Sequence, residues 1–279
     1  MTPGVFSGPG HGCVRVAHLA GRSVVTQAYA TSPLRLLTPR NHGEAAWIFT
    51  SSFGGGFVDQ DHTSLDLTVG DGAAAFVSTQ ASSKVYRSPR GTGARLTAHV
   101  GRDALLVLVP DPVVPFAGAL FEQDQRFVLD ASGSLILVDW VSSGRRESGE
   151  RWRFTSYVNR LAVDVDEAVV LRDALALRQE DGELSERMGR FDVLATVLVL
   201  GRPLLTYAAT LVTALTRVPV EKRPAQLAVA TLLEHKRLGD VGCLVRMAGG
   251  TVDEVGRAIR AYLRFVPDLL GDDPWGRKW

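Results

Sequence analysis

The stretch SLDLTVGDGAAAFVST, residues 64–79, carries the pattern that decides the fold class. Leucine or valine occupies positions 65, 67 and 69, whereas serine, aspartate and threonine occupy positions 64, 66 and 68. This period of two is typical of a half-buried β-strand. Gly-Asp-Gly at 70–72 supplies a turn, and the apolar run after it has the composition of a second strand. The stretch therefore predicts a mainly β fold.

Similar short strands are predicted on both sides of this stretch. They cover residues 14–19, 73–79, 94–99, 104–109, 125–129, 135–140, 151–158, 161–165 and 167–171. Glycine-rich or polar turns separate them, for example at 91–93, 132–133 and 142–144. Many short strands without long helices between them indicate a sandwich, a barrel or a β-helix-like scaffold of stacked sheets. The sequence shows no strict repeat period, so periodicity does not choose among these folds.

The pattern changes after residue 190, where strands and a few helices are both predicted. Residues 191–200 form an apolar strand, and Pro203 begins a helix that runs to about Thr216. Residues 226–233 and 242–247 predict a last strand pair. Residues 251–265 form an amphipathic helix, capped by Thr251 and Glu254 and stopped by Pro267. We expect one domain over residues 1–279, β-rich at 14–180 and mixed at 190–267, with a flexible tail at 271–279.

Composition excludes several classes of protein. The chain has 279 residues, of which 46% are hydrophobic and 22% charged, and its formal net charge is +1. Such values are ordinary for a folded protein and argue against disorder and against general nucleic-acid binding. The sequence has no secretory signal and no uninterrupted run of about 20 apolar residues. Its two cysteines fit a reducing cytoplasm, so we expect a cytoplasmic protein without a membrane anchor.

Standard catalytic motifs are absent from the sequence, and the main candidate for chemistry is a short acidic cluster. Asp59, Asp61 and His62 follow three glycines, and if residues 59–61 are extended, both carboxylates share one face. Oxygen and nitrogen ligands suit nickel or zinc, so a metal-dependent hydrolase using these three residues is one hypothesis. The alternative is that the three side chains cap a turn and face water.

A second unusual segment, residues 78–87, is polar although it ends an apolar strand. Its sequence is STQASSKVYR, which includes Gln80, Lys84, Tyr86 and Arg87. These side chains could form an internal hydrogen-bond network. They could equally form a surface that recognises a partner.

These segments resemble the urease accessory protein UreD (UreH) family, which is recognised by several motifs in order. Residues 55–61 are similar to its G-G-x-V-x-G-D motif, and residues 78–87 to its T-T-Q-A-A-T-K-V-Y-R motif. Residues 108–119 look like its P-x-P-x-I-P-F-x-x-A segment. Asp139 with residues 144–154 is similar to its D…G-R-x-x-x-G-E-x-W-x-F segment, and residues 171–175 to its R-D-x-L motif. One departure is Gln60, which stands where the family has glycine and would be strained if that position needs a positive φ.

The resemblance implies a non-enzymatic, β-helix-type scaffold that works in urease maturation. Such a protein would bind UreF, which recruits the GTPase UreG, and the complex would dock on urease apoprotein as a hetero-oligomer. It would hold no permanent cofactor, and Ni²⁺ would pass through in transit. The absence of a P-loop fits this role. A third hypothesis is a partner-binding β-domain that serves another metalloenzyme.

The family motifs suggest which side chains line a nickel path. Weak oxygen ligands suit transport, because tight sites would trap nickel. The candidates are the carboxylates of Asp61, Asp139, Glu150 and Asp173. Each has a structural alternative: Asp61 could cap a turn, Asp139 could terminate its strand, Glu150 could pair with Arg145 or Arg153, and Asp173 could cap a turn or pair with Arg172. Lys84 and Arg145 are expected to form structural pairs.

Overall fold

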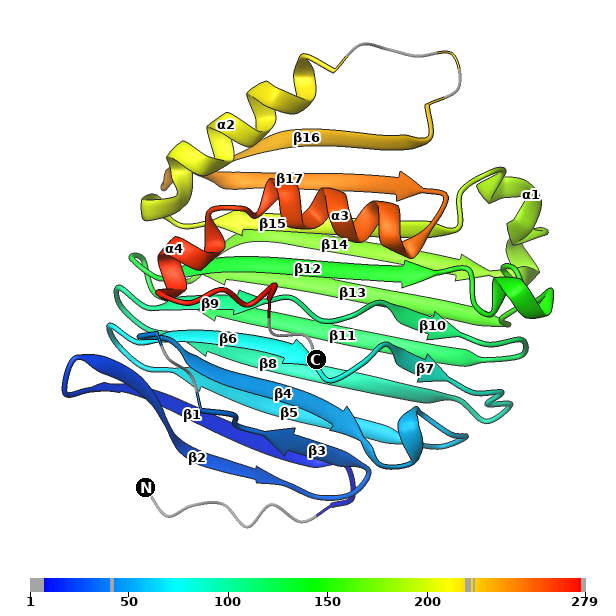
Figure 1. Cartoon of the computed structure of the whole chain (residues 1–279), viewed down its shortest axis with the longest axis horizontal. Helices are drawn as coiled ribbons and strands as arrows, with labels where there is room; N and C mark the ends of the chain where they lie inside the picture. The colour runs from blue at the N-terminus through cyan, green and yellow to red at the C-terminus, as the bar shows by residue number, and fades with distance from the viewer. Residues whose placement is uncertain (1–7, 41–42, 219–221, 223, 277–279) are drawn as a thin grey trace.

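The computed structural model describes residues 8–40, 43–218, 222 and 224–276, and it consists of two stacked β-sheets with helices on one side (Figure 1). One sheet has seven strands in the order β14-β13-β11-β8-β5-β1-β2. Their bounds are β1 (His11–Leu19), β2 (Arg22–Ala30), β5 (His62–Val69), β8 (Thr92–Val100), β11 (Leu120–Leu129), β13 (Ser156–Val165) and β14 (Ala168–Arg178). The predicted mainly β fold is confirmed.

The other sheet has ten strands, eight of them in the order β16-β17-β15-β12-β9-β6-β4-β3. Two short strands, β7 and β10, lie off this path; they pair with each other, and β10 also pairs with β12. The bounds are β3 (Leu34–Leu37), β4 (Ala46–Ser52), β6 (Ala74–Thr79), β7 (Ser83–Val85), β9 (Leu105–Leu108), β10 (Val113–Pro115), β12 (Ser134–Ser142), β15 (Val193–Leu200), β16 (Gln226–His235) and β17 (Gly239–Gly249).

Between β5 and β13 the chain passes back and forth between the sheets, and each pass places a strand parallel to the one before. β5 pairs parallel with β8, β8 with β11, and β11 with β13, while β6, β9 and β12 do the same in the other sheet. This is the coil of a β-helix. Bonds between successive turns join residues about one turn apart in sequence: Asp71 to Arg102, 31 residues on, and Thr79 to Asp111, 32 residues on.

The alternating pattern that predicted β5 is confirmed by its burial. Leu65, Leu67 and Val69 are buried between the two sheets, and Asp66 and Thr68 are exposed on the outer face. A second apolar cluster lies between the ten-stranded sheet and the helices, and includes Trp47, Phe76 and Val255. The two clusters make the ten-stranded sheet apolar on both faces, which explains continuous apolar runs such as residues 193–200.

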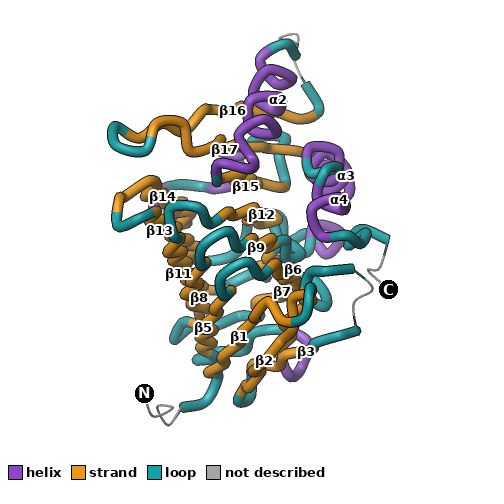
Figure 2. Tube along the Cα trace, turned by 90° about the vertical axis from the view of Figure 1, so that its left-hand side faces the viewer, coloured by secondary structure: helices purple, strands orange, loops and turns teal. Residues whose placement is uncertain are grey.

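The helices lie mainly toward the C-terminus, over the outer face of the ten-stranded sheet (Figure 2). They are α1 (Leu184–Met188), α2 (Leu205–Thr216), α3 (Val252–Tyr262) and α4 (Val266–Leu270), with single 3-10 turns at Phe53–Gly55, Arg146–Ser148, Gln179–Asp181 and Arg202–Leu204. The predicted cap of α3 is present, because the Thr251 hydroxyl accepts a hydrogen bond from the Glu254 N–H. In the described part of the chain, none of the helices has the length and apolarity that crossing a membrane requires.

Three predictions about local structure are wrong. The strand predicted at 151–158 begins only at Ser156, because the preceding residues form a turn in which Trp152 has a φ of +54°. Pro267 does not stop the long helix, which ends at Tyr262; it lies in the first turn of α4, where a missing N–H costs nothing. The tail is not free over 271–276, since the Trp275 ring packs edge-on against Phe76 at 6.5 Å. Residues 277–279 lie outside the described part.

Candidate functional site

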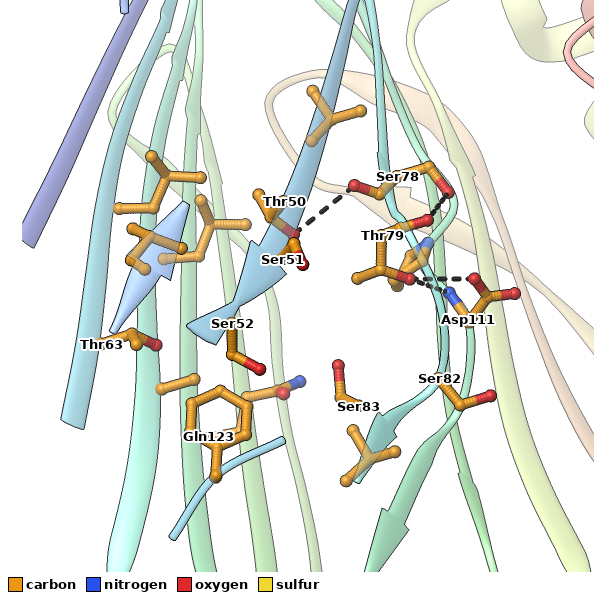
Figure 3. A pocket seen from close by; sticks show the side chains of 18 of the residues that line it. Thr50, Ser51, Ser52, Thr63, Ser78, Thr79, Ser82, Ser83, Asp111 and Gln123 are labelled. Atoms are coloured by element: carbon orange, nitrogen blue, oxygen red, sulfur yellow. Dashed lines mark hydrogen bonds between the residues drawn. The ribbon is translucent and has the colours of Figure 1, made fainter. Parts of the chain in front are cut away.

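The main candidate site is a cavity of about 200 Å³ between the two sheets. Side chains with hydroxyl groups are frequent in its lining and come from the ends of β4, β5, β6 and β7 (Figure 3). They are Thr50, Ser51, Ser52, Thr63, Ser78, Thr79, Ser82 and Ser83. Apolar side chains, including Phe57 and Phe121, complete the wall. The space is large enough for several water molecules, and the hydroxyl groups can hydrogen bond to them.

Asp139 is the buried carboxyl group of this cavity. It lies inside β12, faces the seven-stranded sheet, and is 9% exposed. The carboxamide of Gln123 donates a hydrogen bond to its Oδ1 at 3.2 Å, and that of Asn159 donates to its Oδ2. Gln125 Nε2 donates in turn to Asn159 Oδ1 at 3.2 Å. A buried carboxyl group is therefore held by neutral amides.

The environment of Asp139 changes its acidity. Burial, which penalises the charged form, raises the pKa of Asp139 from 3.8 to about 6, although hydrogen bonds from the amides partly oppose this. A cation that entered the cavity would stabilise the charged form without displacing any ion-pair partner, since the hydrogen bonds to Asp139 come from amides. The site can thus attract a cation through one carboxylate and several weak oxygen ligands.

A second carboxyl group in the lining, Asp111, was not among the predicted candidates. Its backbone N–H donates to the Thr79 hydroxyl at 2.7 Å, and that hydroxyl donates to Asp111 Oδ2 at 3.1 Å. Asp111 stands between two prolines in a family-like segment, and this position was the signal that could have identified it.

The structure does not bring the four predicted carboxylates together, although Asp173 lies near enough to Asp139 for its charge to help raise the pKa of Asp139. Of these, Asp139 alone lines the cavity. Asp61 accepts a hydrogen bond from the Val58 N–H at 2.9 Å and closes a turn. Glu150 pairs with Arg145, as the structural alternative predicted, and also accepts from the Ala117 N–H. Their roles in a nickel path remain predictions.

Two of the structural alternatives are wrong. Asp173 pairs with Arg246 of β17 at 2.6 Å rather than with Arg172, because β14 and β17 face each other across the two sheets. Arg172 instead pairs with Asp164. Asp139 does not terminate its strand, since β12 continues to Ser142.

The acidic cluster at 59–62 does not form a site. Residues 59–61 turn rather than extend, because Gln60 has a φ of +73°, so the condition under which Gln60 would be strained at the position of the family glycine is met. Asp59 is held by Arg90 at 2.6 Å, and His62 Nδ1 contacts the Gln60 carbonyl oxygen at 3.0 Å. Throughout the described residues, no group of three or more His, Cys, Asp or Glu side chains is arranged to hold a metal ion. The hydrolase hypothesis therefore lacks its proposed metal site.

Segment 78–87 divides into an inner and an outer part. The Ser78 hydroxyl donates to the Val109 carbonyl at 2.6 Å, so the first side chain of the segment is bonded internally, while a network among the other side chains stays a prediction. Gln80, Lys84 and Arg87 are exposed, and their role as a partner surface stays a prediction. Tyr86 packs edge-on against Phe116, and the Arg145 guanidinium lies 4.3 Å above the same ring, so Arg145 is a structural pair-former.

Comparisons with known proteins agree with the family resemblance. The sequence profile described as UreD urease accessory protein matches residues 9–279. A protein named urease accessory protein UreD from Sorangium cellulosum is 48% identical over 270 residues, which cover 97% of this chain and 84% of that protein. A UreD protein from Anaeromyxobacter is 40% identical over 96% of this chain and 89% of its own length. Urease accessory protein D of Arabidopsis thaliana is 36% identical over 69% of this chain and 68% of its own.

Proposed function

Because this chain belongs to the UreD family of urease accessory proteins, and so has a role in urease maturation, we propose that it passes nickel through the cavity between its sheets to urease apoprotein. The observation that carries the proposal is the cavity itself, whose largely apolar wall carries several hydroxyl groups and the buried carboxyl group of Asp139. In this view the protein guides an ion and breaks no bond.

The chemistry of the lining supports transfer rather than storage. Nickel binds tightly to sites that combine several imidazole or thiolate ligands, and a tight site would hold the ion. Hydroxyl groups and two separate carboxyl groups bind nickel more weakly. The carboxyl group of Asp139, with its pKa raised to about 6, is mostly ionised at neutral pH and can balance part of the charge of the ion. Asp111, hydrogen bonded to Thr79, adds a second carboxyl group elsewhere in the lining.

We propose that the chain acts within a hetero-oligomer. UreF would bind it directly, UreG would join through UreF and supply the GTPase activity, and urease apoprotein would receive the nickel. The exposed side chains of Gln80, Lys84 and Arg87 lie in the segment that also supplies Ser82 and Ser83 to the cavity lining, so they are placed to contact a partner there. The two buried free thiols, Cys13 and Cys243, fit a cytoplasmic location.

The test is co-expression of urease with its accessory proteins, with this chain, without it, or with one of two variants. Asp139→Asn removes the buried charge but keeps the size and a hydrogen-bond acceptor. Asp71→Asn is the matched control, because Asp71 pairs with Arg102 on the exposed surface and does not line the cavity. Urease activity and nickel bound per urease active site would be measured.

We expect urease to lose most of its nickel and activity without the chain and with Asp139→Asn, and to keep both with Asp71→Asn. Urease that matures equally well without the chain would refute the role in maturation. If Asp139→Asn matures urease as well as the natural chain does, the cavity is not the path.

A further inference from the structure

We propose that the side-chain carbonyl oxygens of Gln123 and Gln125 are the atoms that contact the nickel ion inside the cavity, and that Asp139 holds these two amides in the orientation that presents them. The inference rests on the proposed function, because it takes the ion in transit to be the occupant. Gln123, Gln125 and Asp139 all line the cavity. Neither glutamine is among the candidates predicted from the sequence.

The two glutamines share one face of β11, because they are two residues apart in a strand. That face is part of the cavity lining, and Figure 3 shows Gln123 among the side chains that carry hydroxyl groups. Asn159 is the register partner of Gln123 on the neighbouring strand β13. Three amides therefore lie together beside the Asp139 carboxyl group.

The charge of Asp139 decides which way these amides face. An ionised carboxylate only accepts hydrogen bonds, so each amide that contacts it must turn its NH2 group toward it. Gln123 Nε2 donates to Asp139 Oδ1 at 3.2 Å, and Asn159 Nδ2 donates to Asp139 Oδ2. Asn159 Oδ1 then faces away from the carboxylate and accepts from Nε2 of Gln123 and from Nε2 of Gln125, both at 3.2 Å. The NH2 groups of both glutamines are thus bound within the network, and their carbonyl oxygens point out of it.

The two carbonyl oxygens are left for an occupant of the cavity. Within the described part of the chain, no group donates a hydrogen bond to Oε1 of Gln123 or of Gln125, and neither oxygen is closed off from the surrounding space. Gln125 is only 8% exposed, and a side chain buried to this degree normally has partners for its polar atoms. Water or a cation in the cavity can be that partner.

An amide carbonyl group suits an ion in transit. It is a neutral oxygen ligand, which nickel binds less tightly than imidazole or thiolate. Both oxygens of the Asp139 carboxylate already accept hydrogen bonds from amides, so its charge polarises those amides and turns their negative ends toward the cavity. The ion is attracted by this charge but contacts neutral oxygens, and it can therefore leave again.

The test is NMR of the full chain, labelled with ¹⁵N, during titration with nickel chloride, because Ni²⁺ is paramagnetic and broadens the signals of nearby groups. We expect the side-chain NH2 signals of Gln123 and Gln125 to broaden first, with a dissociation constant of about 1 mM. Gln179 is the internal reference, because its Nε2 donates to the Trp152 carbonyl oxygen and neither residue lines the cavity. Its signal should stay sharp at the same nickel concentration.

Substitution separates a ligand from a residue that only forms the wall. Gln123→Met has a similar size but lacks the carbonyl oxygen, so it should weaken nickel binding about fivefold or more. Gln125→Met should do the same, and it tests the ligands if Gln123→Met does not fold. Gln27→Met is the matched control that should leave the affinity unchanged, because Gln27 lies on β2 and does not line the cavity.

A double variant tests the orienting role of Asp139. The side chain in Asp139→Asn can donate as well as accept, so the neighbouring amides lose their fixed direction, and nickel binding should weaken. If Asp139 acts through Gln123, the chain with both Asp139→Asn and Gln123→Met should bind nickel little worse than the weaker of the two single variants.

The outcomes distinguish this inference from the proposed function. Glutamine signals that broaden no earlier than that of Gln179, or an unchanged affinity in both methionine variants of the cavity, would refute the carbonyl ligands. Additive losses in the double variant would refute the orienting role of Asp139. In either case the nickel path still stands if Asp139→Asn fails to mature urease. If nickel binds as expected but Asp139→Asn matures urease normally, the path is refuted and the ligands stand.

Discussion

Removal of the buried charge at Asp139 should make the protein more stable while it disables nickel transfer. The pKa of Asp139 rises from 3.8 in the unfolded chain to about 6 in the folded protein, because burial disfavours the carboxylate. The folded state therefore binds this proton more tightly than the unfolded state. Stability is gained as pH falls from above 6 toward 3.8, and it is lost as pH rises through 6. At pH 8 the free energy of unfolding is therefore about 3 kcal/mol lower than at a pH below 3.8, as far as this one carboxyl group is concerned.

The variant Asp139→Asn cannot ionise, so it escapes this loss. We expect its free energy of unfolding, measured by urea titration, to lie close to that of the natural chain near pH 4 and to exceed it by up to about 3 kcal/mol at pH 8, with most of the change between pH 4 and 6. Glu150→Gln is a control of opposite sign. The hydrogen bond from Arg145 lowers the pKa of Glu150, so this variant should be less stable at pH 7, and its deficit should shrink as pH falls below 4.5.

A gap between Asp139→Asn and the natural chain that stays constant from pH 4 to pH 8 would refute this reasoning, because it would mean that the buried group does not titrate in this range. An Asp139→Asn chain that is less stable at every pH would show that its hydrogen bonds outweigh the cost of burying the charge.

Three further predictions concern the backbone and the core. Gly242→Ala should cost several kcal/mol by urea unfolding, since Gly242 has a φ of +149° and an added Cβ would lie 2.0 Å from the Val199 carbonyl oxygen; an unchanged midpoint would contradict the packing of β15 on β17. Gln60→Gly should stabilise the chain by about 1 kcal/mol in thermal unfolding, because glycine relieves the positive φ at that turn; a lower melting temperature would be the contrary result. Phe76→Ala should cost about 3–5 kcal/mol, because Phe76 is 2% exposed among Trp47, Phe49 and Trp275, and a cost below about 1 kcal/mol would mean that this aromatic cluster is loosely packed.

Local patterns in the sequence predicted the elements, but not how they stack. The alternation at 64–69 and the cap at Thr251 are properties of neighbouring residues, and both are confirmed. Only the family resemblance implied the coil, and no local pattern did, because its turns repeat a backbone path and not a residue pattern. Asp71 meets Arg102 and Asp59 meets Arg90, each 31 residues on, but the side chains around these pairs differ. The short strands β7 and β10 carry three residues each, too few to show a period.

The candidate site was predicted only in part for the same reason. Asp139 was selected because it lies in a family-like motif, while its neighbours Gln123 and Asn159 come from β11 and β13, 16 and 20 residues away. Pairing across strands brings these three side chains together, and the spacing of the three residues in the sequence does not indicate this contact. Asp61 and Glu150 lie in family-like motifs as well, but their partners are close in sequence: Asp61 accepts a hydrogen bond from the Val58 N–H, and Glu150 pairs with Arg145.

The contact between the last helix and the start of β4 has a consequence during synthesis. The Ala45 N–H donates to the Leu270 carbonyl oxygen, and Trp275 covers Phe76, so residues more than 190 positions apart complete one surface. A ribosome makes β4 and β6 long before it makes residues 266–276. Until those residues emerge, the rings of Trp47, Phe49 and Phe76 lack their final cover, and the nascent chain is open to aggregation or to capture by a chaperone.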